Sequence, residues 1–175
     1  MTQWPEAPAG DDHRKKELVK SRERITAWNR ELQSVHHRLE KALEEARDAI
    51  RNGTRTQTLS PDLRSFCYNF CSALGQHHRS EDAEFFPTLL EQMPELEPAI
   101  TSLTQHHQVL AQLLDDFQKS LDSAESSPRR LLKQINTIKS VMKTHFSAEE
   151  RSLNYALRVL DAPTSDSVRM FGDIR

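Results

Sequence analysis

The chain has 175 residues, of which 29% are charged and 6% are aromatic, with only four glycines and a net charge of −2. This length suffices for one domain with a hydrophobic core, and the few glycines among many Leu, Glu, Gln, Arg and Lys residues favour helix throughout. Acidic and basic residues are interspersed, which excludes a basic surface for nucleic acid or an anionic membrane. No apolar run approaches the ~20 residues of a membrane span, and the first twelve residues carry no secretory signal. We therefore expect a cytoplasmic protein that binds neither nucleic acid nor membrane.

The N-terminal part of the sequence predicts an arm followed by a long helix. Residues 1–12 contain three prolines or glycines and no periodicity, so we expect them to form a disordered arm. The first helix is expected over His13–Asn52, with a break near Ser21 and with Gly53 as its C-terminal signal. A polar loop, residues 54–58, should follow.

The second and third helices are delimited by prolines. Ser60-Pro61 provides a cap residue and a proline at the first helical position, so the second helix should begin there and run to about Gln92. Pro87 should kink or end it locally, because proline lacks an N–H group. Met93-Pro94 makes the next turn, and the third helix is expected over 95–124.

The fourth helix begins with the same cap-proline signal, Ser127-Pro128, and should run to about Leu160. Residues 161–175 are then a C-terminal tail that packs loosely or not at all. Four long helices joined by short loops predict an all-α fold, an up-down-up-down four-helix bundle over residues 13–160 with a metal site in its core.

The metal site is indicated by interruptions of the apolar faces. Each helix has a seam of apolar residues in steps of three and four. The seam residues are Ile25, Trp28, Leu32, Leu39, Leu43, Ala46 and Ile50 in the first helix; Leu63, Cys67, Phe70, Leu74 and Phe85 in the second; Ile100, Leu103, Leu110, Leu114, Phe117 and Leu121 in the third; and Leu131, Ile135, Ile138, Met142, Leu153 and Ala156 in the fourth. At mid-length, polar residues take seam positions instead: His36, His77, Glu81, His107, His145 and Glu149.

Burying these six groups without compensation would cost too much. A buried unpaired carboxylate costs several kcal/mol, roughly, and six such groups would threaten the ~5–15 kcal/mol by which a typical domain is stable. A pair of metal ions compensates them directly, because imidazole and carboxylate are ligands of iron, manganese and zinc.

The spacing of the six residues repeats. His77 and Glu81, like His145 and Glu149, are four apart, so both members of each pair project from one helix face. Each pair follows a single seam histidine on the preceding helix. Two helical hairpins that face each other would therefore supply six ligands around two metals, with the two glutamates placed to bridge them.

Doubled histidines leave alternatives open. The doublets are His36/His37, His77/His78 and His106/His107. The helical phase favours His36, His77 and His107, but His78 also reaches the core through Cys71, Leu74 and Phe85, and His106 through Leu103 and Leu110. Glu40 lies four residues after His36 and is a further candidate ligand. Cys67 and Cys71, four apart in one helix, are read as reduced core residues.

The stretches WNRELQSVHHRL, HHRSEDAEFFP, LTQHHQVL and HFSAEE resemble the hemerythrin-like HHE cation-binding domain over roughly residues 25–160. By this resemblance, the six seam residues are the iron ligands, and the two glutamates bridge. The resemblance implies a centre of two non-haem iron ions, with manganese or zinc as alternatives, that reacts with dioxygen or its reduced forms.

Two departures bear on function. Oxygen-carrying hemerythrins have a second histidine one turn away on the third helix, whereas Leu103 and Ala111 stand four before and four after His107. Their last helix carries aspartate five residues after its histidine, whereas here Glu149 follows His145 by four. Six ligands leave open metal positions, which suit redox chemistry.

We therefore expect a non-haem diiron oxidase, oxygenase or peroxide-consuming enzyme, with dioxygen or peroxide as reactant and an organic small molecule as a further substrate option. The alternative is a protein for reversible oxygen binding, oxygen or iron sensing, or storage. Four aromatic residues could line the site but are more simply explained as packing: Phe70, Phe85, Phe146 and Tyr155.

Overall fold

The computed structural model describes residues 10–56, 61–123 and 126–174 of the chain. Within these ranges the regular secondary structure is entirely helical. The helices, in chain order, are α1 (Gly10–Thr56), α2 (Pro61–Ser80), the π-helical turn η1 (Glu81–Phe85), α3 (Phe86–Gln92), the 3₁₀ turn η2 (Pro94–Leu96), α4 (Glu97–Asp122), α5 (Pro128–Val159), the 3₁₀ turn η3 (Thr164–Asp166) and α6 (Ser167–Phe171).

The first helix is longer than predicted. It begins at Gly10 and runs without a break past Ser21 and Gly53 to Thr56, so the predicted break and the predicted glycine stop are wrong. A helical glycine costs only about 1 kcal/mol relative to alanine, which a long helix with a buried face tolerates. Of the predicted arm, residues 1–9 lie outside the described residues, whereas residues 10–12 are helical.

The second predicted helix follows a continuous helical path from Pro61 to Gln92, interrupted by the wide turn η1. In this turn the N–H of Phe86 donates to the carbonyl of Glu81, five residues back. Pro87 follows at once and has no N–H to donate to the carbonyl four residues before it. The irregularity expected at Pro87 therefore takes the form of a π turn, a feature common at functional sites. The predicted cap Ser60 lies outside the described residues.

The ends of the later helices agree closely with the sequence analysis. The 3₁₀ turn η2 precedes α4, so α4 begins two residues later than predicted, at Glu97. The predicted end at Ala124 lies outside the described residues; α4 itself ends at Asp122. Ser127 caps α5, since its Oγ accepts a hydrogen bond from the N–H of Arg130 over 3.3 Å.

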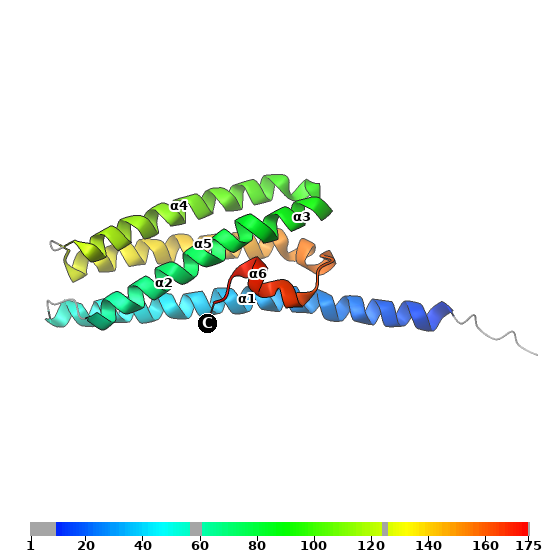
Figure 1. The fold of residues 1–175 in the computed structure, drawn as a ribbon, viewed down its shortest axis with the longest axis horizontal. Helices are drawn as coiled ribbons and strands as arrows, with labels where there is room; N and C mark the ends of the chain where they lie inside the picture. The colour runs from blue at the N-terminus through cyan, green and yellow to red at the C-terminus, as the bar shows by residue number, and fades with distance from the viewer. Residues whose placement is uncertain (1–9, 57–60, 124–125, 175) are drawn as a thin grey trace, which may run out of the picture.

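The long helices lie side by side (Figure 1). α1 contacts α2 and α5, and α4 contacts the same two helices, so the four enclose a common interior. Every predicted seam residue from Trp28 onward is buried in that interior, while the side chain of Ile25 lies outside the described part of the chain. The chain is thus an all-helical bundle. In its described residues, no helix is long and apolar enough to cross a membrane.

The C-terminal tail differs from its prediction. Instead of packing loosely, it folds back against the long helices (Figure 1). Its helix α6 contacts α2, η1 and α1. Met170, Phe171 and Ile174 are buried. Little in the sequence indicated this, because the few apolar residues of this short polar segment show no periodicity.

Candidate metal centre

The six predicted ligands lie on five different elements and are all buried. His36 lies on α1, His77 on α2, and Glu81 begins η1. His107 lies on α4, whereas His145 and Glu149 lie one turn apart on α5. Their exposed fractions are 0% for four of them and 3% for His36 and His107. The bundle therefore brings four imidazoles and two carboxyl groups into its apolar interior.

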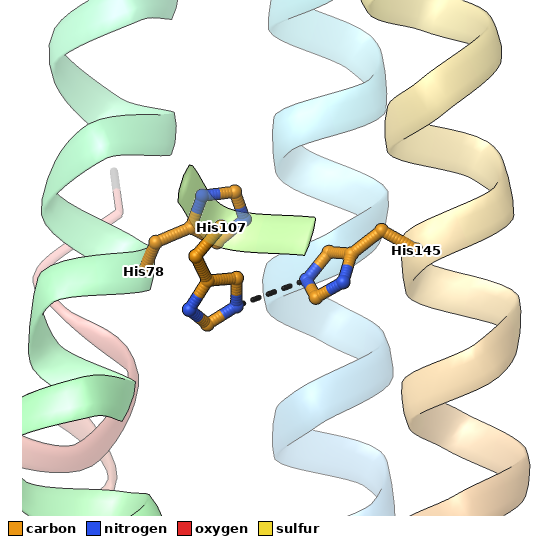
Figure 2. A group of neighbouring side chains, drawn as sticks. All are labelled: His78, His107 and His145. Carbon is orange, nitrogen blue, oxygen red and sulfur yellow. Dashed lines mark hydrogen bonds between the residues drawn. The ribbon is translucent and has the colours of Figure 1, made fainter. Parts of the chain in front are cut away.

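These residues, with one addition, form two neighbouring groups. Within each group the potential ligand atoms lie within 4.8 Å of one another. The first group contains His36, His77, Glu81 and Glu149, and the second contains His78, His107 and His145. The addition is His78, which is only 5% exposed. Figure 2 shows the three imidazoles of the second group turned toward one another.

The two glutamates connect the groups. Glu81 lies 3.3 Å from Nε2 of His77 through one carboxylate oxygen and 3.4 Å from Nε2 of His107 through the other. Glu149 Oε2 lies 3.1 Å from Nε2 of His36 and 3.8 Å from Nε2 of His145. Each carboxyl group therefore contacts one histidine of each group, which is the arrangement expected of a bridging ligand.

Several of these buried atoms have no hydrogen-bond partner. They include both carboxylate oxygens of Glu81 and of Glu149, and Nε2 of His36, His77 and His78. Buried polar atoms normally have a partner, because leaving one unsatisfied costs about 1–3 kcal/mol. Nitrogen and oxygen donors that converge in this way fit a metal cation of the iron, manganese or zinc type.

Comparison with protein-family models matches residues 29–157 to the hemerythrin HHE cation binding domain. The chain belongs to this family. Comparisons with curated proteins and with solved structures give no match. Hemerythrin HHE domains bind metal cations, and the matched segment contains all seven residues of the two groups. The C-terminal helix α6 lies outside it.

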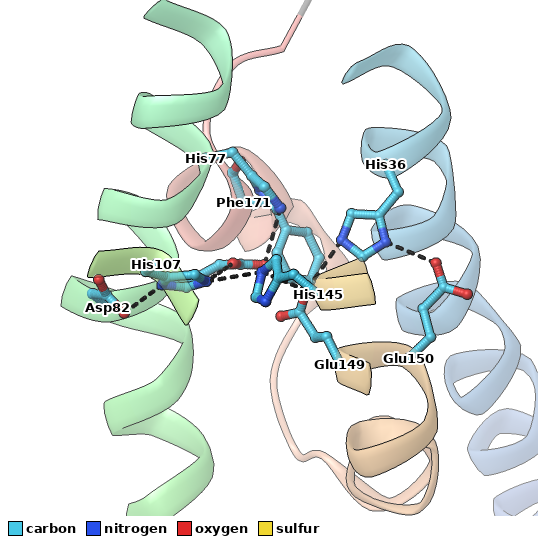
Figure 3. Close-up of polar contacts among 9 residues, drawn as sticks. His36, His77, Asp82, His107, His145, Glu149, Glu150 and Phe171 are labelled. Carbon is cyan, nitrogen blue, oxygen red and sulfur yellow. Dashed lines mark hydrogen bonds and ion pairs between the residues drawn. The ribbon is translucent and has the colours of Figure 1, made fainter. Parts of the chain in front are cut away.

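In this hemerythrin HHE domain, three of the imidazoles are held through Nδ1 (Figure 3). The first, His36, donates from Nδ1 to Glu150 Oε1 over 2.7 Å. The second, His107, donates to Asp82 Oδ1 over 2.8 Å, and the third, His77, donates to the backbone carbonyl of Phe171 over 2.9 Å. An acceptor at Nδ1 fixes the tautomer in which Nε2 carries a lone pair. All three Nε2 atoms therefore face the centre, and those of His77 and His107 do so in the form that binds a metal.

Sequence reasoning missed these Nδ1 partners, although a signal existed. Asp82 and Glu150 each directly follow a buried glutamate, so both His-x-x-x-Glu motifs end in a second acidic residue. Nothing in the sequence pointed to the Phe171 carbonyl.

Burial keeps most of the imidazoles neutral. It lowers the pKa of His77 and of His145 to about 3, and the pKa of His78 well below its ordinary value. His36 differs, because contacts with Glu149 and Glu150 outweigh its burial and raise its pKa. Neutral imidazoles are the metal-binding form, so most of the histidines are ready to bind at neutral pH.

The two glutamates have opposite pKa shifts. Burial, reinforced by the neighbouring Glu149 carboxylate, raises the pKa of Glu81 well above its ordinary value. Burial alone would also raise the pKa of Glu149, but its contact with His36 lowers it to about 2. Without metal, Glu81 therefore keeps its proton to a higher pH than Glu149 does. A bound cation would favour the ionised form of both.

Two phenylalanines pack directly on ligand rings. Phe146 stacks on His36 with ring centroids 3.8 Å apart, and Phe86 stacks on His107 at 5.4 Å. Phe85 and Phe70 are fully buried core residues. Tyr155 is 67% exposed, so it neither packs in the core nor lines the site.

Two of the three histidine doublets separate by burial, whereas His77 and His78 are both buried. His37 is exposed and Glu40 is half-buried, and neither belongs to the two groups. Both line a groove of about 430 Å³ between α1 and α5 that reaches His36, Phe146 and Glu150. His106 is half-buried, with its ring centroid 5.7 Å from that of His145.

Proposed function

We propose that this chain holds two metal ions in the core of an up-down-up-down four-helix bundle. The first group would bind one ion and the second group the other, with Glu81 and Glu149 shared between them. The supporting observation is that each of these two glutamates is fully buried, lacks a hydrogen-bond partner and contacts a histidine of each group. A single ion would leave either the three imidazoles of the second group or the two carboxyl groups of the first group without a metal.

We further propose that the ions are non-haem iron and that the reactant is dioxygen or peroxide. Two iron ions held here would supply electrons and open coordination positions for that reaction. The chain itself excludes bulk water, because the seven donor residues are at most 5% exposed. Manganese and zinc remain alternatives, since the same donor types bind them.

The groove between α1 and α5 supports a small reactant. It reaches His36, a residue that is 3% exposed and whose ring is stacked on Phe146. A diatomic molecule or peroxide can reach the site from this groove with little side-chain movement, whereas a large organic substrate would have to displace the stacked phenylalanine. We therefore favour oxidation or peroxide consumption without a bulky substrate.

His78 favours the alternative function, reversible oxygen binding, sensing or storage without turnover. Six ligands alone would leave many open coordination positions on the two ions. A third imidazole in the second group closes one of them, in the way the missing histidine of the third helix would. The enzyme remains our first proposal, and the two functions differ in whether reactant is consumed.

Metal analysis combined with absorption spectroscopy tests the proposal. We expect about two irons per chain after iron-supplemented expression, and a spectral change when the reduced protein meets dioxygen or peroxide. Repeated consumption of peroxide supports the enzyme, and a stable adduct that reverses on removing oxygen supports the alternative. His77→Ala should lower the iron content, whereas His37→Ala, on the exposed face of α1, should not. A wild-type protein without stoichiometric metal contradicts both functions.

A further inference from the structure

The C-terminal segment, residues 161–174, is built onto the bundle although it lies outside the family match. Trp28 Nε1–H donates to the carbonyl of Ala162 over 3.1 Å. Asp161 and Gln92 exchange two hydrogen bonds, of 3.0 and 3.2 Å, between backbone and side chain. Arg169 forms ion pairs with Glu84 of η1 and with Asp166. Contacts along its whole length therefore hold the segment in place.

Near its end, the segment places the side chain of Phe171 beside the candidate metal centre. Phe171 is fully buried, with its ring edge against Trp28 at 5.7 Å and against Phe85 at 4.8 Å between centroids. Its ring also lies 6.4 Å from the imidazole of His77. Phe171 therefore packs against His77 from outside the four long helices.

The backbone of Phe171 orients the imidazole ring of His77. The Phe171 carbonyl accepts the hydrogen bond from Nδ1 of His77 over 2.9 Å, and both groups are buried (Figure 3). His36 and His107 receive the equivalent contact from carboxylates within the matched domain. His77 receives it only from the tail, so among these three histidines it alone depends on a segment beyond the matched residues.

Gly172 sets the direction of that carbonyl. Its φ of 83° and ψ of 160° lie in a region that is essentially restricted to glycine. A Cβ at this position would also meet Gln76, with its side-chain Cγ at 3.3 Å and its backbone at 3.5 Å. The peptide between Phe171 and Gly172 can therefore point at His77 only because residue 172 lacks a side chain.

We propose that the Gly172 turn is a positioning element of the metal centre: it aims the Phe171 carbonyl at Nδ1 of His77 and so fixes the tautomer and the orientation in which Nε2 binds metal. This inference rests on the proposed metal-binding function. Phe171 and Gly172 act through His77 and do not themselves contact the metal.

The test compares Gly172→Ala with Gly75→Ala in the full-length chain. Gly75 lies on α2, two residues before His77, where an added Cβ meets only the flexible side chain of Arg79. Two quantities are measured: the tautomer of His77 in the metal-free protein by ¹⁵N NMR of its ring, and the affinity and release rate for Co²⁺ by competition with a chelator. Circular dichroism and Trp28 emission in a Trp4→Phe background report the fold and the docking of the tail.

Gly172→Ala should lower the Co²⁺ affinity about 10- to 100-fold, as loss of an outer hydrogen bond to a metal-binding histidine does. It should also shift His77 away from the Nδ1–H tautomer, while Gly75→Ala matches the wild type. Wild-type tautomer and wild-type Co²⁺ binding in Gly172→Ala would overturn the inference, even if the tail had detached.

A second variant serves if Gly172→Ala fails to fold. Arg169→Ala removes an exposed side chain that ties the same segment to η1, so it should speed Co²⁺ release. Unchanged release would overturn the inference. If the wild type binds no Co²⁺, the proposed function fails, and the tautomer still reports whether the tail positions His77.

Discussion

The Nδ1–H of His36 donates a hydrogen bond to Oε1 of Glu150 over 2.7 Å, and Glu150 directly follows the buried Glu149 in sequence. Asp82 has the same relationship to Glu81, and it accepts the hydrogen bond of His107. The contacts cross between the two helical hairpins: an acid on α5 holds the histidine of α1, and an acid on η1 holds the histidine of α4. The two halves of the centre therefore orient each other's single histidine.

The first prediction concerns Glu150. Glu150→Ala removes the acceptor for Nδ1 of His36, so the ring is no longer held with Nε2 toward Glu149. We expect metal affinity to fall about 10- to 100-fold, measured by chelator competition. Glu150→Gln should retain most of the affinity, because its amide oxygen can accept the same hydrogen bond. The matched control is Glu45→Ala, which removes an exposed carboxylate of α1 that pairs with Lys41. Equal affinities of the alanine and glutamine variants would show that His36 does not need this acceptor.

The second prediction concerns Asp82 on the opposite side of the centre. Asp82→Ala should lower metal affinity by a similar factor, since it frees the ring of His107. Asp82→Asn should restore much of it. Asp115→Ala is the control, because this aspartate lies on α4 with His107 but forms an exposed ion pair with Lys119. If Asp82→Ala binds metal as tightly as the wild type while Glu150→Ala does not, the two halves of the centre are not equivalent.

The sequence predicted much of this arrangement because the helical period is a local property. Steps of three and four residues identified the buried face of all four long helices, and the polar residues on those faces are the ones that the bundle brings together. The choice of His36 over His37 and of His107 over His106 follows the same phase, and the structure buries the favoured member in each doublet.

What the sequence could not predict depends on tertiary packing. The sequence offered His78 only as an alternative to His77, whereas the packing of the helices buries both. The crossed acids Asp82 and Glu150 reach histidines on other helices, so their partners follow from interhelical rotation. The Phe171 carbonyl is a backbone group, which has no sequence signature. The docking of the tail depends on a surface formed by α1, α2 and η1 together.

The third prediction tests His78 against its closest counterpart. His78 is buried and stacked on His107 with ring centroids 4.1 Å apart, whereas His106 is only half-buried. His78→Ala leaves two imidazoles in the second group, so we expect the metal content to fall from about two ions per chain toward one. His106→Ala should keep the wild-type content. Elemental analysis decides, and the opposite result would assign the third imidazole to His106.

The fourth prediction concerns the stability of the metal-free protein as a function of pH. As the pH falls below about 6.5, the histidines of the unfolded chain take up protons. In the folded chain the pKa values of His77 and His145 are lowered to about 3, and that of His78 is also lowered, so these rings stay neutral. The unfolded state then binds more protons, and the free energy of unfolding falls as the pH is lowered from 6.5.

Glu81 acts in the opposite direction. Its raised pKa means that the folded state keeps a proton that the unfolded state has lost, which destabilises the fold as the pH rises above about 4.5. Three histidines outweigh one glutamate below pH 6.5, so the slope there should approach about 2–3 kcal/mol per pH unit. Above pH 7 the effect of the three histidines ends, and the raised pKa of His36 lowers the stability with rising pH in the same direction as that of Glu81. Urea unfolding of chelator-treated protein should therefore show greatest stability near neutral pH, and equal stability at pH 5 and pH 7 would contradict the prediction.

The fifth prediction separates a metal centre from a purely structural cluster. Glu81 is fully buried and neither of its oxygens has a hydrogen-bond partner, so without metal it opposes folding. Replacing a poorly compensated buried ionisable group by an apolar one of similar size often stabilises a protein by about 1–4 kcal/mol. Glu81→Leu should therefore raise the melting temperature of the metal-free protein and abolish the further rise that added metal gives the wild type.

Glu45→Leu, on the exposed part of α1, is the control and should change neither quantity. A cluster held together by its own ion pairs would behave in the opposite way: Glu81→Leu would lower the melting temperature, and metal would leave the melting temperature of the wild type unchanged.

The outcome depends on whether histidine contacts alone stabilise the two buried carboxyl groups. Only Glu149 has a close partner at 3.1 Å, in His36, whereas Glu81 lies 3.3 Å or more from both of its histidines. Its raised pKa points the same way, because a carboxyl group stabilised by its neighbours would have a lowered one. Glu81 therefore lowers the stability of the metal-free fold, and its place in the core is explained by its role as a metal ligand.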